Sequence, residues 1–394
     1  MAVLNYLNLT YKEFMKLAYV TTYNAQALSG YNEWAGLGYY IAKALKNQSD
    51  LEYIGPLKDR LFLKAVSKCK RHYYKLLGKD YVLEQLILKD YARQVSQKLS
   101  KVKADIVFSA TTNPITYLEC NQPVVFWADA TFANLLDFYP QYSNLCEESV
   151  KNGHLMETIA LQKSKLAIYS SEWAAKTAIE HYNAEPSKVK VVPFGANVES
   201  NQTFEEIKNL IESKPTNKCN LLFLGVDWHR KGGDVALEVA KRLNQLGLNT
   251  ELTVVGCQPP VKGTLPNFVK PLGFISKSTY EGKKKIYQLL ADSHFLILPS
   301  LADCTPIVFC EANSLGVPCI STQVGGIPTM IKAGVNGNIF KIDGDITEYC
   351  DYIYRLFLNY KEYKNLALSA FNEYQSRLNW SVAGKTVNSL LNQL

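Results

Sequence analysis

Two acidic residues near the end of an apolar strand have the types and spacing needed to bind a sugar. Asp303 and Glu311, with seven residues between them, lie in LPSLADCTPIVFCEANSLGVP, which leaves a predicted strand that ends at Leu298. Carboxylates accept hydrogen bonds from vicinal hydroxyl groups, such as those of a hexose or a ribose. The pair alone is also compatible with a solvated loop aspartate and a helical glutamate, so its neighbours decide the interpretation.

The residues between the two acids predict the start of a helix. Thr305 suits the N-cap and Pro306 the first helical position. The free backbone amides from Ile307 and Val308 onward would then face the end of the strand, with the positive end of the helix dipole behind them, and such amides bind anions. A sugar nucleotide requires carboxylates that accept hydrogen bonds from its hydroxyl groups and, beside them, amides that donate hydrogen bonds to its phosphates.

A second segment, NLLFLGVDWHRKGGDVALEVAKRL, places positive charge at the end of another predicted strand. Gly225 follows the strand, Arg230 and Lys231 lie on a short loop, and two glycines open the next helix. Adjacent cations on such a loop can neutralise a diphosphate leaving group. The alternative is an exposed basic turn before a helix that starts with glycine.

These loops belong to a chain in which short apolar, β-branched runs alternate with segments of helical period. The pattern is typical of parallel sheets covered by helices on both faces. The predicted strands are 17–22, 105–109, 124–127, 166–170, 189–192, 220–224, 251–255, 295–298 and 317–321. Because 394 residues favour two domains, we expect an α/β protein with two Rossmann-like, doubly wound parallel sheets that face a central cleft.

A polar stretch with little apolar periodicity, 199–218, predicts the linker between the two domains. The first domain then comprises 1–198, completed by a C-terminal helix at 378–394, and the second comprises 219–377. Ligands of open α/β sheets bind at the carboxyl ends of the strands, so the function should lie in the loops that the two domains turn toward each other.

The composition is that of an ordinary soluble globular protein, with 47% hydrophobic and 20% charged residues. The net charge of +7 is spread along the chain, which suits an anionic small ligand or a lipid surface and argues against nucleic acid. Nine cysteines without zinc spacing predict reduced thiols. The opening MAVLNYLNLTYKEFMK lacks the pattern of a signal peptide, and we expect a cytoplasmic protein.

Three segments make the chain resemble glycosyltransferase family 4, the retaining enzymes of GT-B architecture, over nearly its whole length. Asp303 and Glu311 match the family's motif of two glutamates separated by seven residues, with Asp in the first place. The FLG...RKGGD segment is similar to its phosphate-binding loop, and SSEWAAKTAIEHYNAEPSKVKVVPFGANV is similar to the end of its N-terminal domain. The resemblance implies that Glu311 binds the ribose, Asp303 the hexose and Lys231 the diphosphate, in a C-terminal donor domain facing an N-terminal acceptor domain.

The resemblance also implies donor contacts made largely through the backbone. Gly36 and Gly38, in YNEWAGLGYYIAKAL, match a glycine loop that approaches the donor phosphates. Phe274 and Ile275, within LGFI, match the place of base contact, and Gly256 lies at an adjacent strand end. Uracil and guanine both remain open as the base. The other expected donor contacts are Gly225, Thr305, Pro306, Ile307 and Val308.

The chain departs from the family's pattern near the diphosphate and near the reacting sugar. Val226 stands where the family commonly has an arginine, and Arg230 is the expected replacement. In FWADATF, Ala128 replaces a histidine of many relatives and Asp129 remains, either as a catalytic acceptor-side carboxylate or as a loop cap. The further acceptor-side candidates are His154, for which a structural role is the alternative, and Trp34.

The implied reaction moves a hexose from a UDP- or GDP-linked donor, such as UDP-glucose or GDP-mannose, to a hydroxyl acceptor in glycan, polysaccharide or glycolipid synthesis. Transfer would be retaining and need no metal or other cofactor, because Lys231, Arg230 and the helix amides would stabilise the departing diphosphate. The only Asp-x-Asp, Asp343 with Asp345, is interpreted as a turn. Two alternatives stay open: a GT-B protein that binds nucleotide sugar without transferring it, and a sugar-nucleotide epimerase.

The segment 60–79, RLFLKAVSKCKRHYYKLLGK, predicts a basic amphipathic helix. Its basic stripe comprises Lys64, Lys68, Arg71 and Lys75, and its second stripe comprises Val66, Cys69, Tyr73 and Leu76. Such a helix can lie on anionic lipid, which predicts peripheral contact with a membrane. A solvated basic face is the alternative.

Overall fold

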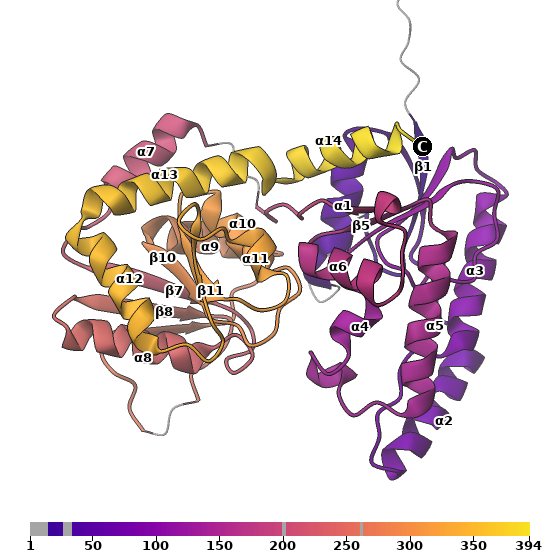
Figure 1. The fold of residues 1–394 in the computed structure, drawn as a ribbon, viewed down its shortest axis with the longest axis horizontal. Coiled ribbons are helices and arrows are strands. Elements are labelled where there is room, and N and C mark those ends of the chain that lie inside the picture. Colours follow the sequence, from indigo (N-terminus) through magenta and orange to yellow (C-terminus); the bar gives the residue numbers. More distant parts are fainter. Residues whose placement is uncertain (1–14, 27–33, 199–201, 261–262) are drawn as a thin grey trace, which may run out of the picture.

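The computed structural model describes residues 15–26, 34–198, 202–260 and 263–394. Within them the chain forms two lobes, each built on one six-stranded parallel sheet (Figure 1). The predicted α/β fold with two doubly wound parallel sheets is confirmed. The expectation that the chain opens without a signal peptide falls on residues 1–14, which lie outside the described residues.

The sheet of the first lobe has the order β2-β1-β3-β4-β5-β6. Its strands are β1 (Lys16–Val20), β2 (Asp50–Ile54), β3 (Ile106–Ser109), β4 (Val124–Ala128), β5 (Leu166–Tyr169) and β6 (Val189–Val191). Its helices are α1 (Leu37–Lys46), α2 (Leu61–Leu76), α3 (Gln85–Leu99), α4 (Phe132–Leu135), α5 (Glu147–Lys163) and α6 (Glu172–Glu180). Side chains of β1 alternate between two cores, as a strand buried on both faces requires: Leu17 packs with residues of α1, whereas Ala18 packs with residues of α3.

The sheet of the second lobe has the order β9-β8-β7-β10-β11-β12, in which the direction of strand addition reverses between β7 and β10. Its strands are β7 (Cys219–Leu224), β8 (Thr250–Val255), β9 (Val269–Gly273), β10 (Phe295–Leu298), β11 (Cys319–Thr322) and β12 (Gly337–Phe340). Its helices include α8 (Gly233–Gln245), α9 (Tyr280–Asp292), α10 (Ile307–Asn313), α11 (Ile327–Met330), α12 (Ile346–Leu358) and α13 (Tyr360–Arg377). In doubly wound sheets the ligand binds where the order reverses, which directs attention to the loops after β7 and β10.

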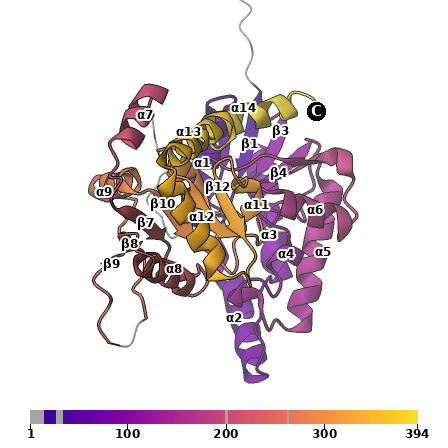
Figure 2. The same cartoon turned by 60° about the vertical axis from the view of Figure 1, so that its left-hand side comes forward.

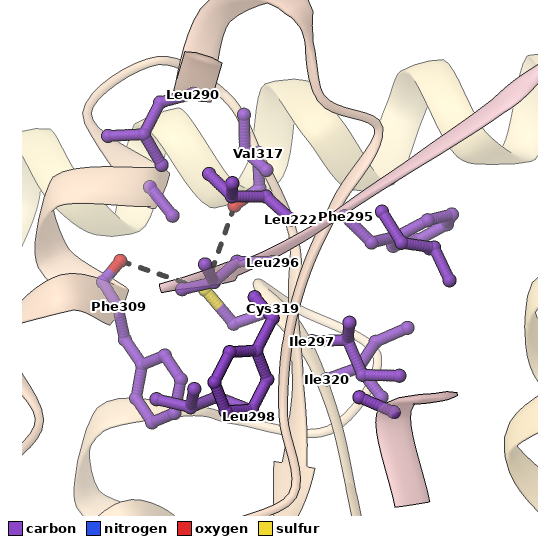
Figure 3. Packing of buried hydrophobic residues seen from close by; sticks show 14 of the residues in the cluster. Leu222, Leu290, Phe295, Leu296, Ile297, Leu298, Phe309, Val317, Cys319 and Ile320 are labelled. Atoms are coloured by element: carbon purple, nitrogen blue, oxygen red, sulfur yellow. Dashed lines mark hydrogen bonds between the residues drawn. The ribbon is translucent and has the colours of Figure 1, made fainter. Parts of the chain in front are cut away.

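The core of the second lobe fixes α10 against the central strands. Phe309 of α10 is fully buried beside Leu296 and Cys319, and the Cys319 thiol donates to the Phe309 carbonyl at 3.7 Å (Figure 3). Because the interior is closely packed, this contact sets where the helix begins. The start of α10 is therefore held rigidly at the end of β10.

The segment predicted as a linker, 199–218, contains a helix, α7 (Phe204–Glu212). Ile207 and Ile211, one turn apart, are buried in the core of the second lobe, and the threonine at 203 closes a capping box with Glu206. A short helix with two buried residues gives too little apolar periodicity to detect in the sequence. The C-terminal helix α14 (Trp380–Leu391) follows α13 across both lobes (Figure 1 and Figure 2) and places Ala383, Val387 and Leu391 in a core of the first.

All nine cysteines are free thiols in the structure. Across the described residues, no helix combines the length and the apolar character needed to cross a bilayer.

Candidate active site

A cleft of about 470 Å³ lies between the two lobes, at the reversal point of the second sheet. Loops after β7, β8, β9 and β10 form one wall, and residues after β1 and β4 form the other. The predicted site residues that line the cleft are Trp34, Asp129, Gly225, Arg230, Lys231, Gly256, Phe274, Ile275, Asp303, Thr305, Pro306, Ile307, Val308 and Glu311. The structure thus brings together residues that are up to 277 positions apart, from Trp34 to Glu311.

Lys231 and Asp303 form an ion pair within the cleft. Lys231 comes from the loop before α8 and Asp303 from the loop before α10, and the two loops meet because β7 and β10 are paired neighbours. The side chains are only 13% and 10% exposed. A cation shielded from solvent acts on a bound phosphate more strongly than one in water, so the pair places a strong positive charge beside an acceptor of hydrogen bonds.

Glu311 forms a second buried pair, with Lys277 from the loop after β9. The side chain of Glu311 is 1% exposed, and Lys277 contacts its Oε2 atom. Its Oε1 atom is buried and has no hydrogen-bond partner among the described residues. Because an unsatisfied buried acceptor is costly, this oxygen is suited to accept a hydroxyl group from a ligand in the cleft.

Lys277 was missed in the sequence because it lies on a loop after a strand that was not predicted. It nevertheless supplies a second cation in the cleft, where Val226 leaves the expected arginine position apolar. Arg230, the predicted replacement, is partly engaged elsewhere: Nη1 donates to the Ala302 carbonyl at 2.9 Å, and the guanidinium lies 5.5 Å from the ring centroid of Tyr139. Tyr139, also missed, accepts a hydrogen bond from the Cys304 amide at 3.0 Å and so joins the two lobes.

If the cleft binds the nucleotide-sugar donor expected from the sequence, replacing Lys277 by methionine should raise the KM for that donor by roughly tenfold or more, since one hydrogen bond to a charged group contributes about 1.5–3 kcal/mol. The melting temperature should also fall, because Glu311 would be buried without its partner. Steady-state kinetics and thermal melts measure both effects. Lys284→Met, on the exposed side of α9, is the matched control, and an unchanged donor KM in Lys277→Met would contradict the role.

The helix between the two acids begins one residue later than predicted. Helix α10 starts at Ile307, its N-cap is Pro306, and no side chain caps it. Thr305 is not the N-cap because its hydroxyl is 2.6 Å from that of Ser170, in the first lobe. The amides of Ile307 and Val308 belong to the first turn, where backbone N–H groups have no intrahelical acceptor, and both residues line the cleft.

The loop that carries Lys231 depends on Gly232. This residue has φ +75°, and a Cβ atom there would lie 1.9 Å from the Pro299 carbonyl oxygen on the neighbouring loop. Only glycine permits both the left-handed backbone and this close approach. The loops that hold Lys231 and Asp303 are therefore in direct contact through their backbone atoms.

Gly232→Ala is expected to lower the free energy of unfolding by roughly 3 kcal/mol, because it combines backbone strain of about 1–3 kcal/mol with a clash. Gly247→Ala is the control: its φ is +88°, but a Cβ atom there meets nothing within 4 Å. Gly247→Ala should lower the free energy of unfolding by the backbone strain alone, about 1–2 kcal/mol. Urea unfolding of the two variants measures the difference, and equal losses would refute the close-approach argument.

A second cavity, of about 540 Å³, lies in the first lobe and shares Trp34, Asp129 and Tyr139 with the cleft. The Trp34 indole donates to Asp129 Oδ2 at 3.2 Å. Burial raises the pKa of the Asp129 carboxyl, and the Trp34 hydrogen bond opposes this. Glu157, which also lines the cavity, has its pKa raised to about 7 by burial. Asp129 thus stands where the two cavities meet.

Three predicted site residues do not line the cleft. Gly36, with φ +78°, caps α1, and a Cβ atom on Gly38 would be 3.5 Å from Tyr23, so both residues shape the start of that helix. Residues 31–33 of their loop are outside the described residues. His154 lies in a separate surface hollow, where Nδ1 is 2.9 Å from the Tyr182 hydroxyl and burial lowers the pKa of the imidazole. Its contacts support the structural alternative.

Asp345, of the Asp-x-Asp sequence, caps α12 by accepting a hydrogen bond from the Thr347 amide at 2.8 Å. This agrees with its interpretation as a turn. In the described part of the chain, no group of three or more His, Cys, Asp or Glu side chains is arranged to hold a metal ion.

The family model described as glycosyl transferases group 1 matches residues 204–372. The matched segment includes Lys231, Lys277, Asp303 and Glu311. The matched segment therefore contains both buried ion pairs of the cleft, whereas Asp129 and Trp34 lie outside it.

The curated relatives match this chain over only part of their own length. N-acetyl-alpha-D-glucosaminyl L-malate synthase of Bacillus anthracis is 32% identical over 134 residues, which cover 34% of this chain and 34% of that protein. D-inositol 3-phosphate glycosyltransferase of Thermobifida fusca is 26% identical over 57% of this chain and 53% of its own. Lipopolysaccharide glucosyltransferase WaaG of Escherichia coli is 30% identical over 37% of this chain and 41% of its own. The chain thus spans about half or less of the length of these relatives.

Solved structures match over nearly the whole chain. Sucrose-phosphate synthase from Thermosynechococcus elongatus gives a TM-score of 0.66 at 14% identity, covering 96% of this chain and 98% of that one. HepE from Anabaena in complex with UDP-glucose gives 0.61 at 17% identity, covering 96% and 100%. At such identities the likeness concerns the fold, and it confirms the predicted GT-B architecture.

Proposed function

We propose that this protein is a retaining glycosyltransferase that moves a hexose from a nucleoside-diphosphate sugar to a hydroxyl acceptor. The observation that carries the proposal is the pairing of Lys231 with Asp303 and of Lys277 with Glu311. Both pairs are shielded from solvent and lie where the strand order of the second sheet reverses. Two carboxylates and two cations in one cleft match the hydroxyl groups and the diphosphate of such a donor.

The donor would lie along the wall formed by the second lobe. The unpartnered Oε1 atom of Glu311 accepts a ribose hydroxyl, and Asp303 accepts hydroxyl groups of the hexose. Lys231 and Lys277 bind the diphosphate, together with the amides that begin α10. The base, uracil or guanine, would lie against the LGFI segment, where Phe274 is 63% exposed and free to stack.

The acceptor would enter from the cavity of the first lobe. Its described lining contains two carboxyl groups, Asp129 and Glu157, and no cation, with aromatic rings such as Trp34 and Tyr142 around them. Carboxyl oxygens accept hydrogen bonds from hydroxyl groups, and the described lining offers no cation to bind an anion. We therefore propose a neutral, hydroxyl-bearing acceptor such as a sugar, although relatives are named for L-malate and D-inositol 3-phosphate.

The chemistry would be electrostatic. As the glycosidic C–O bond breaks, negative charge collects on the diphosphate, and Lys231, Lys277 and the helix amides stabilise it in a site shielded from water. The acceptor oxygen bonds to the anomeric carbon on the face from which the diphosphate departs, and the leaving phosphate takes the proton of that hydroxyl group, so the anomeric configuration is retained. Asp129, where the cavities meet, orients the acceptor hydroxyl. We expect that the lysines make a metal ion unnecessary for this reaction. We also expect the protein to work in the cytoplasm, because free thiols persist in that reducing compartment.

The test is a panel of UDP- and GDP-linked sugars, UDP-glucose and GDP-mannose included, offered with a mixture of neutral sugar acceptors. We expect release of nucleoside diphosphate from one donor, in EDTA as in buffer, and a product whose anomeric proton coupling in NMR matches that of the donor. Binding without release would favour the non-transferring protein. Conversion of the donor to its epimer without release would favour the epimerase, and inversion would refute the mechanism.

A further inference from the structure

Helix α2 exposes an unusual number of apolar side chains. Ser67 is its only buried residue, whereas Leu61, Phe62, Tyr73, Leu76 and the adjoining Leu77 are 86%, 74%, 58%, 74% and 59% exposed. Single apolar residues on a surface need no explanation, but a contiguous group marks a place of contact with another molecule or a membrane. One end of α2 also projects beyond the rest of the first lobe in both views (Figure 1 and Figure 2).

The exposed apolar residues share one side of the helix. At 3.6 residues per turn, Leu61, Phe62, Cys69, Tyr73 and Leu76 fall within about one third of the circumference. We call these five residues, with Leu77, the apolar stripe. It corresponds to the second stripe predicted from the sequence, but it faces away from the core of the lobe.

A different side of α2 holds the helix to its own lobe. Lys70 Nζ lies 2.7 Å from Glu148 and 3.1 Å from Glu84, and the Tyr74 hydroxyl donates to Glu148 at 2.8 Å. The Tyr81 hydroxyl donates to Glu84 at 2.9 Å and completes this cluster. Because the cluster fixes how the helix is turned, the apolar stripe cannot rotate inward without breaking these bonds.

The basic stripe lies beside the apolar stripe on the exposed surface. In the described part of the chain neither Lys64 nor Lys68 forms an ion pair, and Lys75 pairs only with Asp80, at 3.4 Å and largely in solvent. The contact of Arg71 is to the Ser67 hydroxyl, at 3.3 Å. Such exposed interactions contribute little, so the charges are available to an anionic surface.

We propose that α2 docks this protein on an anionic membrane, with the apolar stripe in the headgroup region and the basic stripe against lipid phosphates. Apolar burial combined with attraction between cations and anionic lipid is the physical basis of interfacial helices. The side facing the lipid is set by the Lys70 cluster, which leaves both stripes outward. This surface is separate from the residues that line the cleft and does not depend on the proposed reaction.

The test is co-sedimentation of the full chain with vesicles of phosphatidylcholine, with or without phosphatidylglycerol. We expect binding to the anionic vesicles that weakens with salt. Lys64→Ser/Lys68→Ser should lower the partition coefficient by roughly 25-fold, since each cation near the surface contributes about fivefold. Phe62→Ser/Leu76→Ser should lower it by at least tenfold, because it removes two exposed apolar anchors.

Lys283→Ser/Lys284→Ser on α9 is the matched control. It removes the same charge from an exposed helix, and its partition coefficient should stay within twofold of the unmodified protein. The proposal is overturned if the unmodified protein prefers neither vesicle, if the control loses as much binding as the Lys64 and Lys68 variant, or if Phe62→Ser/Leu76→Ser binds normally. It is also overturned if the protein is a dimer in solution that this last variant dissociates. All three variants should release nucleoside diphosphate normally without vesicles.

Discussion

Lys231→Met is expected to lower kcat for nucleoside diphosphate release by about 100- to 1000-fold, the effect of removing one preorganised group that stabilises developing charge. The reason is positional: Lys231 is held in the cleft by Asp303 and by the backbone contact at Gly232, so its charge is in place before the donor arrives. A coupled assay for the released diphosphate measures the change. A fully active Lys231→Met would refute the assignment.

The same substitution leaves Asp303 without its cation in a site where its side chain is 10% exposed. A loss of activity could therefore reflect a loss of fold. Lys231→Met/Asp303→Asn removes the stranded charge and should recover the melting temperature without recovering kcat. Lys241→Met, which replaces an exposed lysine of α8 that pairs with Glu238, should behave as the unmodified protein in both assays.

Glu311→Ala should weaken binding of the nucleoside diphosphate by roughly 10- to 150-fold, since it removes one hydrogen bond to a charged group, of about 1.5–3 kcal/mol. The buried Oε1 atom of Glu311, unpaired in the described structure, is the acceptor that the ribose would use. Isothermal titration with UDP and with GDP measures the loss.

Loss of Glu311 also strands Lys277, whose side chain is 14% exposed. Glu311→Gln/Lys277→Met removes both charges with little change in shape and should melt close to the unmodified protein. If this double variant bound the nucleotide normally, the two buried groups would be structural and the donor would lie elsewhere.

The sequence predicted the central strands because they are buried on both faces and read as apolar runs. The strands it missed, β2, β9 and β12, are three of the four edge strands. An edge strand is paired on one side only and is partly exposed, so DLEYI, VKPLG and GNIF carry too few apolar residues to stand out. The linker helix α7 escaped for a related reason, because only two of its residues are buried.

The site was predictable wherever its residues follow central strands. Lys231, Asp303 and Asp129 lie on the loops that follow β7, β10 and β4, and sheet order alone brings such loops together. Lys277 follows an edge strand, and Tyr139 lies on a loop without periodicity, so no local pattern marks either. His154 was misplaced because it lies within α5, and which side a helical residue faces depends on packing against Phe132 and Tyr182.

The central claim is that the cleft holds a nucleoside diphosphate between its two buried ion pairs. Isothermal titration of the full chain with UDP and GDP, in buffer that contains EDTA, tests this most directly. The account predicts one bound nucleotide per chain for at least one of the two, with binding weakened at least tenfold in Glu311→Ala. Equal affinity in the unmodified protein and this variant, or no binding of either nucleotide, would contradict it.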